Sequence, residues 1–542
     1  MTRAEQGPFR VLISDNVAPE CLAVFEGVKE IELDYEPKLS REALLERLPR
    51  YDGWIVRSGT KVDAEALARA ERLRAVVRAG VGVDNIDLRE ATRRGVLVMN
   101  TPEGNTVAAA EHAIALLFAA ARNVPQAHAA LHEGRWERKR WIGVAVAGKT
   151  LGVIGLGKVG REVARRGVGL GMRVLGYDPF VTEEVARALE IEVADLDEVV
   201  READFLSLHV PLNDRTRGLI DARRLESMKP GAIVINTARG GVVDEAALLE
   251  AIRGGAIAGA ALDVFTEEPL PAGSPLLEEP RIVLTPHLGA STREAQEAVG
   301  TQSARQLIDY LLHGAITHPV NMVAVDPALA ERVEPWTELL RRLGSMQAQL
   351  REGTVRQIVL RYAGELFGPS ERRWLTLGFL AGFLRHFVSA PVNLVNAEHL
   401  AREHHLQVVE EATSETYDYT HLVTTEVETV EGGTQALRVR RLAGTIFGQR
   451  SPRLVRLDGY QTDALPEGPM LLVSNTDTPG VIGLIGTLLG EQGINIASMY
   501  VGRDTTGGTA LAILNVDSEP PAEVLERLAA QPGILWVRTI RP

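Results

Sequence analysis

The sequence predicts an α/β protein of several domains, and three observations carry this prediction. Apolar, strand-like runs alternate with helical patterns from the N-terminus to about residue 287, which is typical of parallel sheets with right-handed crossovers. A glycine-rich turn near residue 155 lies at the start of a second such series. The last segment, from about Pro466, follows the order strand, helix, strand, strand, helix, strand of a ferredoxin-like fold.

Length and composition limit the number of domains and the classes of function that the chain can have. The 542 residues are too many for one hydrophobic core and suggest three or four domains. A formal net charge of −13 and the lack of a basic stripe argue against nucleic acid as a partner. With one cysteine, Cys21, no disulfide can form within the chain, and we expect no metal site. The N-terminus has no apolar signal segment and the apolar run 113–121 is too short to span a membrane, so we expect a cytoplasmic protein.

The first α/β series begins with short apolar runs separated by helical patterns. Buried strands are expected at 11–15, 52–58, 74–80 and 96–102. Helices are expected at 40–48 and 62–73, and a long, largely buried helix at 106–122.

The second series is expected to place strands at 150–157, 173–179, 204–212, 231–240, 259–265 and 281–287. Two α/β modules in succession make a cleft between them, where small-molecule sites are common. Residues 326–455 mix helices with alternating strands and carry no catalytic motif that we recognise.

The glycine-rich turn has the spacing of a dinucleotide site. Gly155, Gly157 and Gly160 follow an apolar strand and open a helix, and Asp178 ends the next strand. The glycines allow, in order, a tight turn, close approach of a pyrophosphate, and helix–strand packing, while the helix N-terminus attracts the phosphates. Asp178 can accept hydrogen bonds from ribose hydroxyls and would repel a 2′-phosphate. The turn therefore predicts NAD rather than NADP.

Three charged residues follow predicted strands: Arg239, Glu268 and His287. Open α/β sheets place their ligands at these carboxyl ends. A histidine can take a hydroxyl proton, a carboxylate can fix its tautomer, and an arginine can grip a substrate carboxylate. Each residue alone could be a solvated loop charge, but their common position behind a cofactor motif favours catalysis.

Four motifs resemble the D-isomer-specific 2-hydroxyacid dehydrogenases: "GLGKVGREVA", "NTARGGVVDE", "ALDVFTEEP" and "PHLGAST". The stretch "RAGVGVDNIDLREATRRGVLVMNTPEGNTVAAAEH" is also similar to the N-terminal half of that family. The resemblance covers about residues 8–320. Beyond it, the layout is similar to long-form members that carry an intervening domain and a regulatory ACT domain.

The resemblance implies a flavodoxin-like substrate domain (8–102 and 288–320), a Rossmann NAD-binding domain (103–287), an α+β intervening domain (321–456) and an ACT domain (467–542). It implies oxidation of 3-phosphoglycerate with NAD, the first step of serine biosynthesis, by a homodimer or homotetramer. In that family the residues matching Arg239, Glu268 and His287 are catalytic. We interpret Gly240 and Gly241 as leaving room for the arginine.

The remaining site residues follow from the same resemblance. Besides the glycine motif and Asp178, cofactor contacts are implied for Lys158, Val159, Val210, Pro211, Thr237, Ala238, Asp263 and Gly289. A phosphorylated substrate would need cations and an amide-lined turn at one end. The N-terminal half offers side chains at Arg57, Ser58, Lys61 and Arg78, and backbone amides at Gly80, Val81 and Gly82. Many relatives carry threonine at the position of Val81, but its amide is unaffected. Arg138 either reaches a partner subunit's site or belongs to a solvated basic run.

In the C-terminal segment, Asn475, Asp477 and Asn495 match effector-binding positions of ACT domains, and the implied effector is L-serine. A carboxylate suits an ammonium group and an amide suits either end of a zwitterion. The alternative is a dimerisation module that binds nothing.

Two other functions remain open at this point. A glyoxylate or hydroxypyruvate reductase would keep the catalytic residues but would not need the phosphate-binding cations or an ACT domain. An NAD-sensing, corepressor-like scaffold could keep both the glycine motif and the catalytic residues without turnover.

Overall fold

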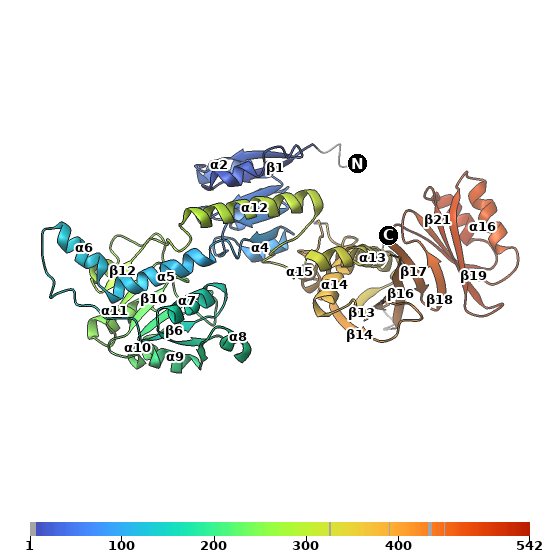
Figure 1. The fold of residues 1–542 in the computed structure, drawn as a ribbon. Helices are drawn as coiled ribbons and strands as arrows, with labels where there is room; N and C mark the ends of the chain where they lie inside the picture. The colour runs from blue at the N-terminus through green and yellow to red at the C-terminus, as the bar shows by residue number, and fades with distance from the viewer. Residues whose placement is uncertain (1–6, 325–326, 390, 432–435, 449) are drawn as a thin grey trace.

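The structure is a computed structural model that describes residues 7–324, 327–389, 391–431, 436–448 and 450–542. Figure 1 shows two α/β units, formed by the N-terminal part of the chain, at one end of an elongated molecule. Two further units, formed by the C-terminal part, lie at the other end, with the last helices and strands farthest from the N-terminal units.

The first unit is a five-stranded sheet of order β2-β1-β3-β4-β5 in which every pairing is parallel. This is the flavodoxin-like order and confirms that prediction. The strands are β1 (Phe9–Ile13), β2 (Ile31–Tyr35), β3 (Gly53–Val56), β4 (Ala75–Arg78) and β5 (Leu97–Asn100). The helices are α1 (Pro19–Ala23), α2 (Arg41–Arg47), α3 (Ala64–Arg69) and α4 (Leu88–Arg93).

A helix from later in the chain, α12 (Arg293–His313), returns to this sheet. Its Leu307 lies directly against Gly53 of β3, where a Cβ would be 2.9 Å from the leucine methyl carbons. Figure 1 shows α12 lying beside the strands of the first unit, although it follows the second unit in sequence.

The second unit is a seven-stranded sheet of order β12-β11-β10-β9-β6-β7-β8, all parallel, which confirms the Rossmann prediction. The strands are β6 (Thr150–Ile154), β7 (Arg173–Tyr177), β8 (Glu192–Val193), β9 (Phe205–Leu208), β10 (Ile233–Asn236), β11 (Gly259–Leu262) and β12 (Ile282–Leu284). The helices are α5 (Thr106–Ala121), α6 (Val124–His132), α7 (Lys158–Gly169), α8 (Glu183–Ala188), α9 (Leu196–Glu202), α10 (Ala222–Ser227) and α11 (Glu245–Gly254). The strand order reverses at β6, so ligands are expected at its carboxyl end.

No single helix in the described part of the chain is long and apolar enough to cross a membrane. The pair α5 and α6 meets the length and composition limits only when taken together, and the two helices bend by 63° at their junction. The alanines of α5 face the core of the Rossmann unit, which accounts for its apolar composition.

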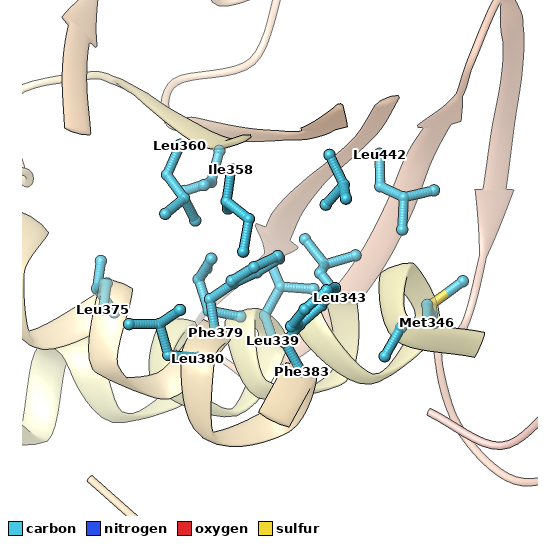
Figure 2. Packing of buried hydrophobic residues seen from close by; sticks show 14 of the residues in the cluster. Leu339, Leu343, Met346, Ile358, Leu360, Leu375, Phe379, Leu380, Phe383 and Leu442 are labelled. Atoms are coloured by element: carbon cyan, nitrogen blue, oxygen red, sulfur yellow. The ribbon is translucent and has the colours of Figure 1, made fainter. Parts of the chain in front are cut away.

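The third unit is a six-stranded mixed sheet of order β14-β13-β15-β16-β17-β18. Its strands are β13 (Thr354–Ala363), β14 (Gln407–Thr413), β15 (Leu422–Val430), β16 (Leu437–Phe447), β17 (Ser451–Leu457) and β18 (Tyr460–Ala464). Its helices are α13 (Pro327–Leu350), α14 (Pro369–Leu384) and α15 (Ala397–Glu403). Figure 2 shows Leu339 and Leu343 of α13 and Phe379 and Phe383 of α14 packed beneath Ile358 of the sheet.

The fourth unit is an antiparallel sheet of order β20-β21-β19-β22, which confirms the predicted βαββαβ fold. Its elements are β19 (Met470–Thr476), α16 (Val481–Gly490), β20 (Ile496–Arg503), β21 (Thr509–Val516), α17 (Ala522–Ala529) and β22 (Ile534–Ile540). Alternation along β19 sends Leu471 and Val473 under the two helices and Met470 and Leu472 into the core of the third unit.

Candidate active site

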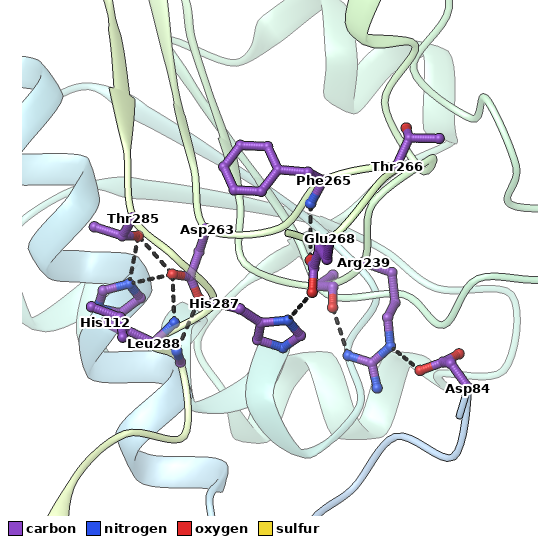
Figure 3. Close-up of polar contacts among 12 residues, drawn as sticks. Asp84, His112, Arg239, Asp263, Phe265, Thr266, Glu268, Thr285, His287 and Leu288 are labelled. Atoms are coloured by element: carbon purple, nitrogen blue, oxygen red, sulfur yellow. Dashed lines mark hydrogen bonds and ion pairs between the residues drawn. The ribbon is translucent and has the colours of Figure 1, made fainter. Parts of the chain in front are cut away.

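The three candidate catalytic residues lie at one edge of the Rossmann sheet. Arg239 follows β10, Glu268 follows β11 and His287 follows β12, and these three strands are neighbours that run in parallel. Their carboxyl ends therefore meet at the same edge. Figure 3 shows the three side chains converging there.

His287 and Glu268 form a pair. The imidazole Nδ1 lies 2.7 Å from a carboxylate oxygen of Glu268, and the other carboxylate oxygen accepts the amide N–H of Phe265 at 3.0 Å. Burial would raise the pKa of Glu268, but the hydrogen bonds from His287 and Phe265 outweigh it and lower the pKa. An ionised carboxylate can only accept, so Nδ1 carries the proton and Nε2 is left as the basic nitrogen.

Arg239 is held from two sides. Its Nε donates to the carboxylate of Asp84 at 2.8 Å, and its Nη1 donates to the carbonyl of Ala238 at 2.6 Å. Asp84 follows β4 of the first unit, the expected substrate domain and hereafter the substrate unit, so the ion pair joins the two α/β units (Figure 3).

The room beside Arg239 comes from a glycine of the other α/β unit. A Cβ at Gly82 would collide with the guanidinium group. A Cβ at Gly240 would instead collide with the carbonyl of Phe265, and Gly241 adopts a φ of 77°. The interpretation that Gly240 and Gly241 make space for the arginine was therefore wrong, because these glycines serve backbone packing and a turn.

Arg57 and Arg239 are each close enough to Arg78 to repel its charge, so the three form a cationic cluster around Arg78. Burial, then repulsion by Arg57 and Arg239, lowers the pKa of Arg78 to about 10, and Asp15 and Asp84 offset part of this. Among the described residues, the Nε of Arg78 has no hydrogen-bond acceptor although it is buried. A buried guanidinium with an unused donor is costly unless an anion binds it.

The glycine-rich turn after β4 offers some of the backbone amides that were expected to bind the substrate phosphate. Gly80 donates its amide to the carbonyl of Arg78 at 2.8 Å, so this amide is not free. For Val81 and Gly82, no protein acceptor of the amide is found in the described ranges. Two of the three expected amides therefore remain for an anion.

The other expected substrate residues lie less centrally. Ser58 and Lys61 are exposed on the loop after β3. Arg138 is exposed in the irregular segment after α6, which Figure 1 shows projecting from the Rossmann unit on the side away from the C-terminal units. The structure does not bring Arg138 to the arginine cluster of its own chain.

The three motif glycines occupy different surroundings. Gly155 has a φ of 92°, and a Cβ there would be 2.5 Å from the carbonyl oxygen of His209. A Cβ at Gly160 would collide with the carbonyl of Gly155. At Gly157 a Cβ would meet nothing within 4 Å, and no side chain caps the helix that begins there. Space and free amides at one point fit a dinucleotide pyrophosphate.

Asp178 is fixed against the same turn. Its carboxylate accepts the amides of Leu156 at 2.8 Å and Phe180 at 2.9 Å, which leaves further lone pairs for a ribose. Lys158 at the start of α7 pairs with Glu103 at 2.7 Å.

Asp263, which is implied to lie near the nicotinamide, is fully buried. Its carboxylate accepts Thr285 Oγ1 at 2.6 Å, the amide of Leu288 at 2.7 Å and the amide of Gly289 at 2.8 Å, and it lies 3.1 Å from His112 Nε2. Burial opposes ionisation of Asp263, but the hydrogen bonds from His112 and Thr285 prevail and lower its pKa.

The other cofactor candidates lie on neighbouring strands. Val210 and Pro211 follow β9, next to His209, whose burial lowers its pKa to about 4 and keeps the ring neutral. Thr237 follows β10, and no partner is found for its buried hydroxyl in the described part of the chain. Ala238 is next in sequence, and its carbonyl already holds Arg239. Val159 packs against the core beneath α7.

Two residues of this site were not identified from the sequence. His112 and Asp84 lie in quoted motifs, but both act on partners more than 150 residues away. The signal for His112 was a lone polar ring in an alanine-rich helix. Nothing in the sequence around Asp84 distinguishes it from other exposed acidic residues. Within the described ranges, no group of three or more His, Cys, Asp or Glu is placed to hold a metal ion.

The effector candidates of the fourth unit do not come together in one chain. Asn475 and Asp477 lie at the carboxyl end of β19, and Asn495 precedes β20 at the opposite end of the sheet. Asp477 accepts the amide of Gly507 at 3.1 Å, and Asn495 donates to Asp517 at 2.9 Å. Asn475 is buried, and its Oδ1 has no partner among the described residues.

Comparison with known proteins gives three family matches. Residues 114–289 match the D-isomer specific 2-hydroxyacid dehydrogenase NAD-binding domain, residues 332–458 the D-3-phosphoglycerate dehydrogenase intervening domain, and residues 470–533 the ACT domain.

Individual relatives extend over nearly the whole chain. D-3-phosphoglycerate dehydrogenase of Methanocaldococcus jannaschii is 40% identical over 533 residues, covering 98% of this chain and 99% of that protein. The protein of the same name from Archaeoglobus fulgidus is 40% identical over 528 residues, covering 97% and 98%. Among solved structures, a protein from Thermus thermophilus aligns with a TM-score of 0.53 and 36% identity over 58% of this chain and 100% of its own.

Proposed function

The chain belongs to the D-3-phosphoglycerate dehydrogenases, and from this premise we propose how its residues carry out the reaction. The reaction is the NAD-dependent oxidation of 3-phospho-D-glycerate to 3-phosphohydroxypyruvate, the first step of L-serine biosynthesis. The observation that carries the assignment of roles is that Arg239 lies at the same sheet edge as the His287–Glu268 pair and acts, together with Arg57, on Arg78 of the other unit.

His287 is the general base. Its Nε2 takes the proton of the substrate C2 hydroxyl, while Glu268 holds Nδ1 and stabilises the imidazolium that forms. NAD, when bound, supplies the acceptor for the hydride that leaves C2. Arg239 binds the substrate carboxylate next to C2 and polarises the carbonyl that develops there. His287 thus receives the hydroxyl proton as the C2 carbonyl forms.

The phosphate end of the substrate is assigned to the substrate unit. Arg57 and Arg78 supply charge, and the free amides of Val81 and Gly82 supply directed hydrogen bonds. The unused Nε donor of Arg78 supports this assignment. Gly157, the α7 N-terminus and Asp178 are the residues that would hold the dinucleotide, with Asp263 and Thr237 near its nicotinamide end.

Regulation by L-serine through the ACT domain is the second part of the proposal. Asp477 would bind the ammonium group and Asn495 the other end of the zwitterion. Because these residues lie at opposite ends of one sheet, a site that uses both requires two copies of the domain. A cytoplasmic location remains a prediction from the sequence.

Assembly as a homodimer or homotetramer is supported by the surface after α5. Large apolar side chains are exposed on α6 and the segment behind it, including Leu131, Trp136 and Ile142, the last two more than three-quarters exposed. Exposed apolar side chains gathered in this way are typical of a contact surface.

The test is a comparison of two substrates in wild type and Arg78→Ala. Loss of a charge-assisted contact to phosphate should raise the KM for 3-phosphoglycerate about 10- to 100-fold. Reduction of hydroxypyruvate, which lacks the phosphate, should change less than about threefold. Arg89→Ala, which removes an exposed arginine of α4, is the matched control.

Equal losses for both substrates would contradict the phosphate role of Arg78. Wild-type turnover of hydroxypyruvate or glyoxylate but not of 3-phosphoglycerate would favour the reductase alternative. Absence of turnover with any of them would favour an NAD-sensing scaffold. Millimolar serine added to the wild-type assay tests the ACT domain, since an unchanged rate would support a domain that only mediates assembly.

A further inference from the structure

The ion pair between Asp84 and Arg239 links the two α/β units. Asp84 stands on the loop between β4 and α4 of the substrate unit, and Arg239 stands on the loop after β10 of the Rossmann unit. Figure 3 shows the two side chains meeting beside His287, with Asp84 on a loop that comes from the substrate unit. The contact therefore exists only while the two units stand at this distance.

The contact also selects which part of the guanidinium remains for a substrate. Asp84 occupies the Nε–H edge at 2.8 Å, and the carbonyl of Ala238 occupies one N–H of Nη1 at 2.6 Å. A guanidinium has five N–H donors in one plane. The donors that remain are one on Nη1 and two on Nη2, and Nη2 packs so closely against Gly82 that a Cβ there would collide with it.

We propose that Asp84 is a positioning residue for the dehydrogenase reaction: it holds Arg239 from the substrate unit so that the Nη end faces the substrate carboxylate. The proposal rests on the carboxylate-binding role proposed above for Arg239. It assigns to Asp84 no contact with the substrate.

An alternative is that Asp84 competes with the substrate for Arg239. A competing carboxylate would be expected to form the bidentate arrangement that a substrate carboxylate prefers. Asp84 instead makes a single hydrogen bond through one oxygen to Nε. Competition also predicts that removal of Asp84 tightens substrate binding, whereas positioning predicts that removal weakens it.

The ion pair is suited to a test because it contributes little to folding. The side chain of Asp84 is 63% exposed, and exposed ion pairs are worth little to stability. The charged groups that face it are Arg239 and Arg78, with Arg57 and Asp15 in the same cluster. A loss of activity in an Asp84 variant can thus be separated from a loss of folded protein by a thermal melt.

The experiment measures kcat and KM for 3-phosphoglycerate and for NAD in Asp84→Ala, Asp84→Asn and Glu32→Ala. Glu32 is the matched control, since it binds the Nε of Arg10 at 3.1 Å on the surface of the same sheet. Asp84→Ala should lower kcat/KM for 3-phosphoglycerate about tenfold, as expected for one charge-assisted hydrogen bond, and leave the KM for NAD unchanged. Asp84→Asn keeps an acceptor for Nε–H and should recover to within about threefold of wild type.

A double variant shows whether Asp84 acts through the arginine. Lysine has no Nε–H edge, so Asp84→Ala in an Arg239→Lys background should cost less than about twofold further. Wild-type kinetics in Asp84→Ala, a lower KM for 3-phosphoglycerate, or full additivity in the double variant would each overturn the proposal. If Arg239→Lys alone kept wild-type kinetics, the role of Arg239 would fail first.

Discussion

Gly157 gives the sharpest test of the nucleotide site, because a single methyl group there separates folding from binding. Gly157 has a φ of −69° and a ψ of −164°, which alanine can adopt, and its Cβ would meet no protein atom within 4 Å. Gly157→Ala should therefore cost the free protein less than about 1 kcal/mol, the usual difference at a helix N-cap.

Dinucleotide binding should respond differently. The methyl group would stand between the pyrophosphate and the amides at the start of α7, and it would weaken at least one charge-assisted hydrogen bond of about 1.5–3 kcal/mol. That energy corresponds to a loss of about 10- to 100-fold in affinity. The assay is a titration with NADH followed by its fluorescence, beside a thermal melt without nucleotide.

Gly160→Ala is the matched comparison within the same motif. Its Cβ would collide with the carbonyl of Gly155, which itself is fixed in a turn with a φ of 92°. Overpacking of this kind costs about 1–3 kcal/mol or more, so this variant should melt earlier than Gly157→Ala. Unchanged NADH affinity in a folded Gly157→Ala variant would refute the placement of the pyrophosphate. Equal melting temperatures for the two variants would refute the distinction between open space at Gly157 and close packing at Gly160.

Two further outcomes are expected. The pKa of Glu268 is lowered from the ordinary value of 4.5, so its carboxylate stays ionised above that pH, and its contribution is lost only as pH falls through the lowered pKa. Glu268→Gln should lower kcat about 100-fold and move the acid limb of the pH–rate profile to lower pH, because the imidazolium loses its counter-ion; an unmoved acid limb would argue against the pairing with His287. Trp136 is 77% exposed, and Trp136→Ala should shift the mass measured by light scattering toward the monomer, whereas an unchanged mass would show that this surface is not an interface.

The sequence predicted those parts of the fold that local patterns encode. Alternating apolar runs located the central strands, and β2 was missed because it is an edge strand. Its sequence IELDY carries Glu32 and Asp34, and its burial is only partial, so it lacks the apolar run of a central parallel strand. Helix α14 was also not located, since every position from Trp374 to Leu384 is buried and its sequence shows no amphipathic period.

The site residues also divide into those that the sequence could predict and those that it could not. The glycine motif, Arg239, Glu268 and His287 follow strands whose carboxyl ends must share an edge, so their convergence could be anticipated from chain order. The roles of Asp84 and Gly82 depend on how one α/β unit faces the other. No periodicity within a strand or helix records that relation, which is why room for the arginine was assigned to its sequence neighbours instead.

The arrangement of the four units limits how an effector on the ACT domain can act on the reaction within one chain. The ACT sheet shares a core with the intervening domain through Met470 and Leu472, and Gln349 of α13 binds the backbone of Arg541 at 3.0 Å and 2.9 Å. The intervening domain in turn reaches the substrate unit, where Asn393 donates to the carbonyl of Gly95 at 2.8 Å.

These contacts join the ACT domain to the unit that carries Asp84, whereas the nucleotide turn lies wholly within the Rossmann unit. A change that travels along them would move the substrate unit against the Rossmann unit and alter the contact between Asp84 and Arg239. Coupling energies between distant sites are typically about 1–3 kcal/mol, and the tenfold change in kcat/KM expected for loss of this contact corresponds to about 1.4 kcal/mol, which falls within that range. Regulation by this route would change the handling of 3-phosphoglycerate and leave the affinity for NADH unaltered.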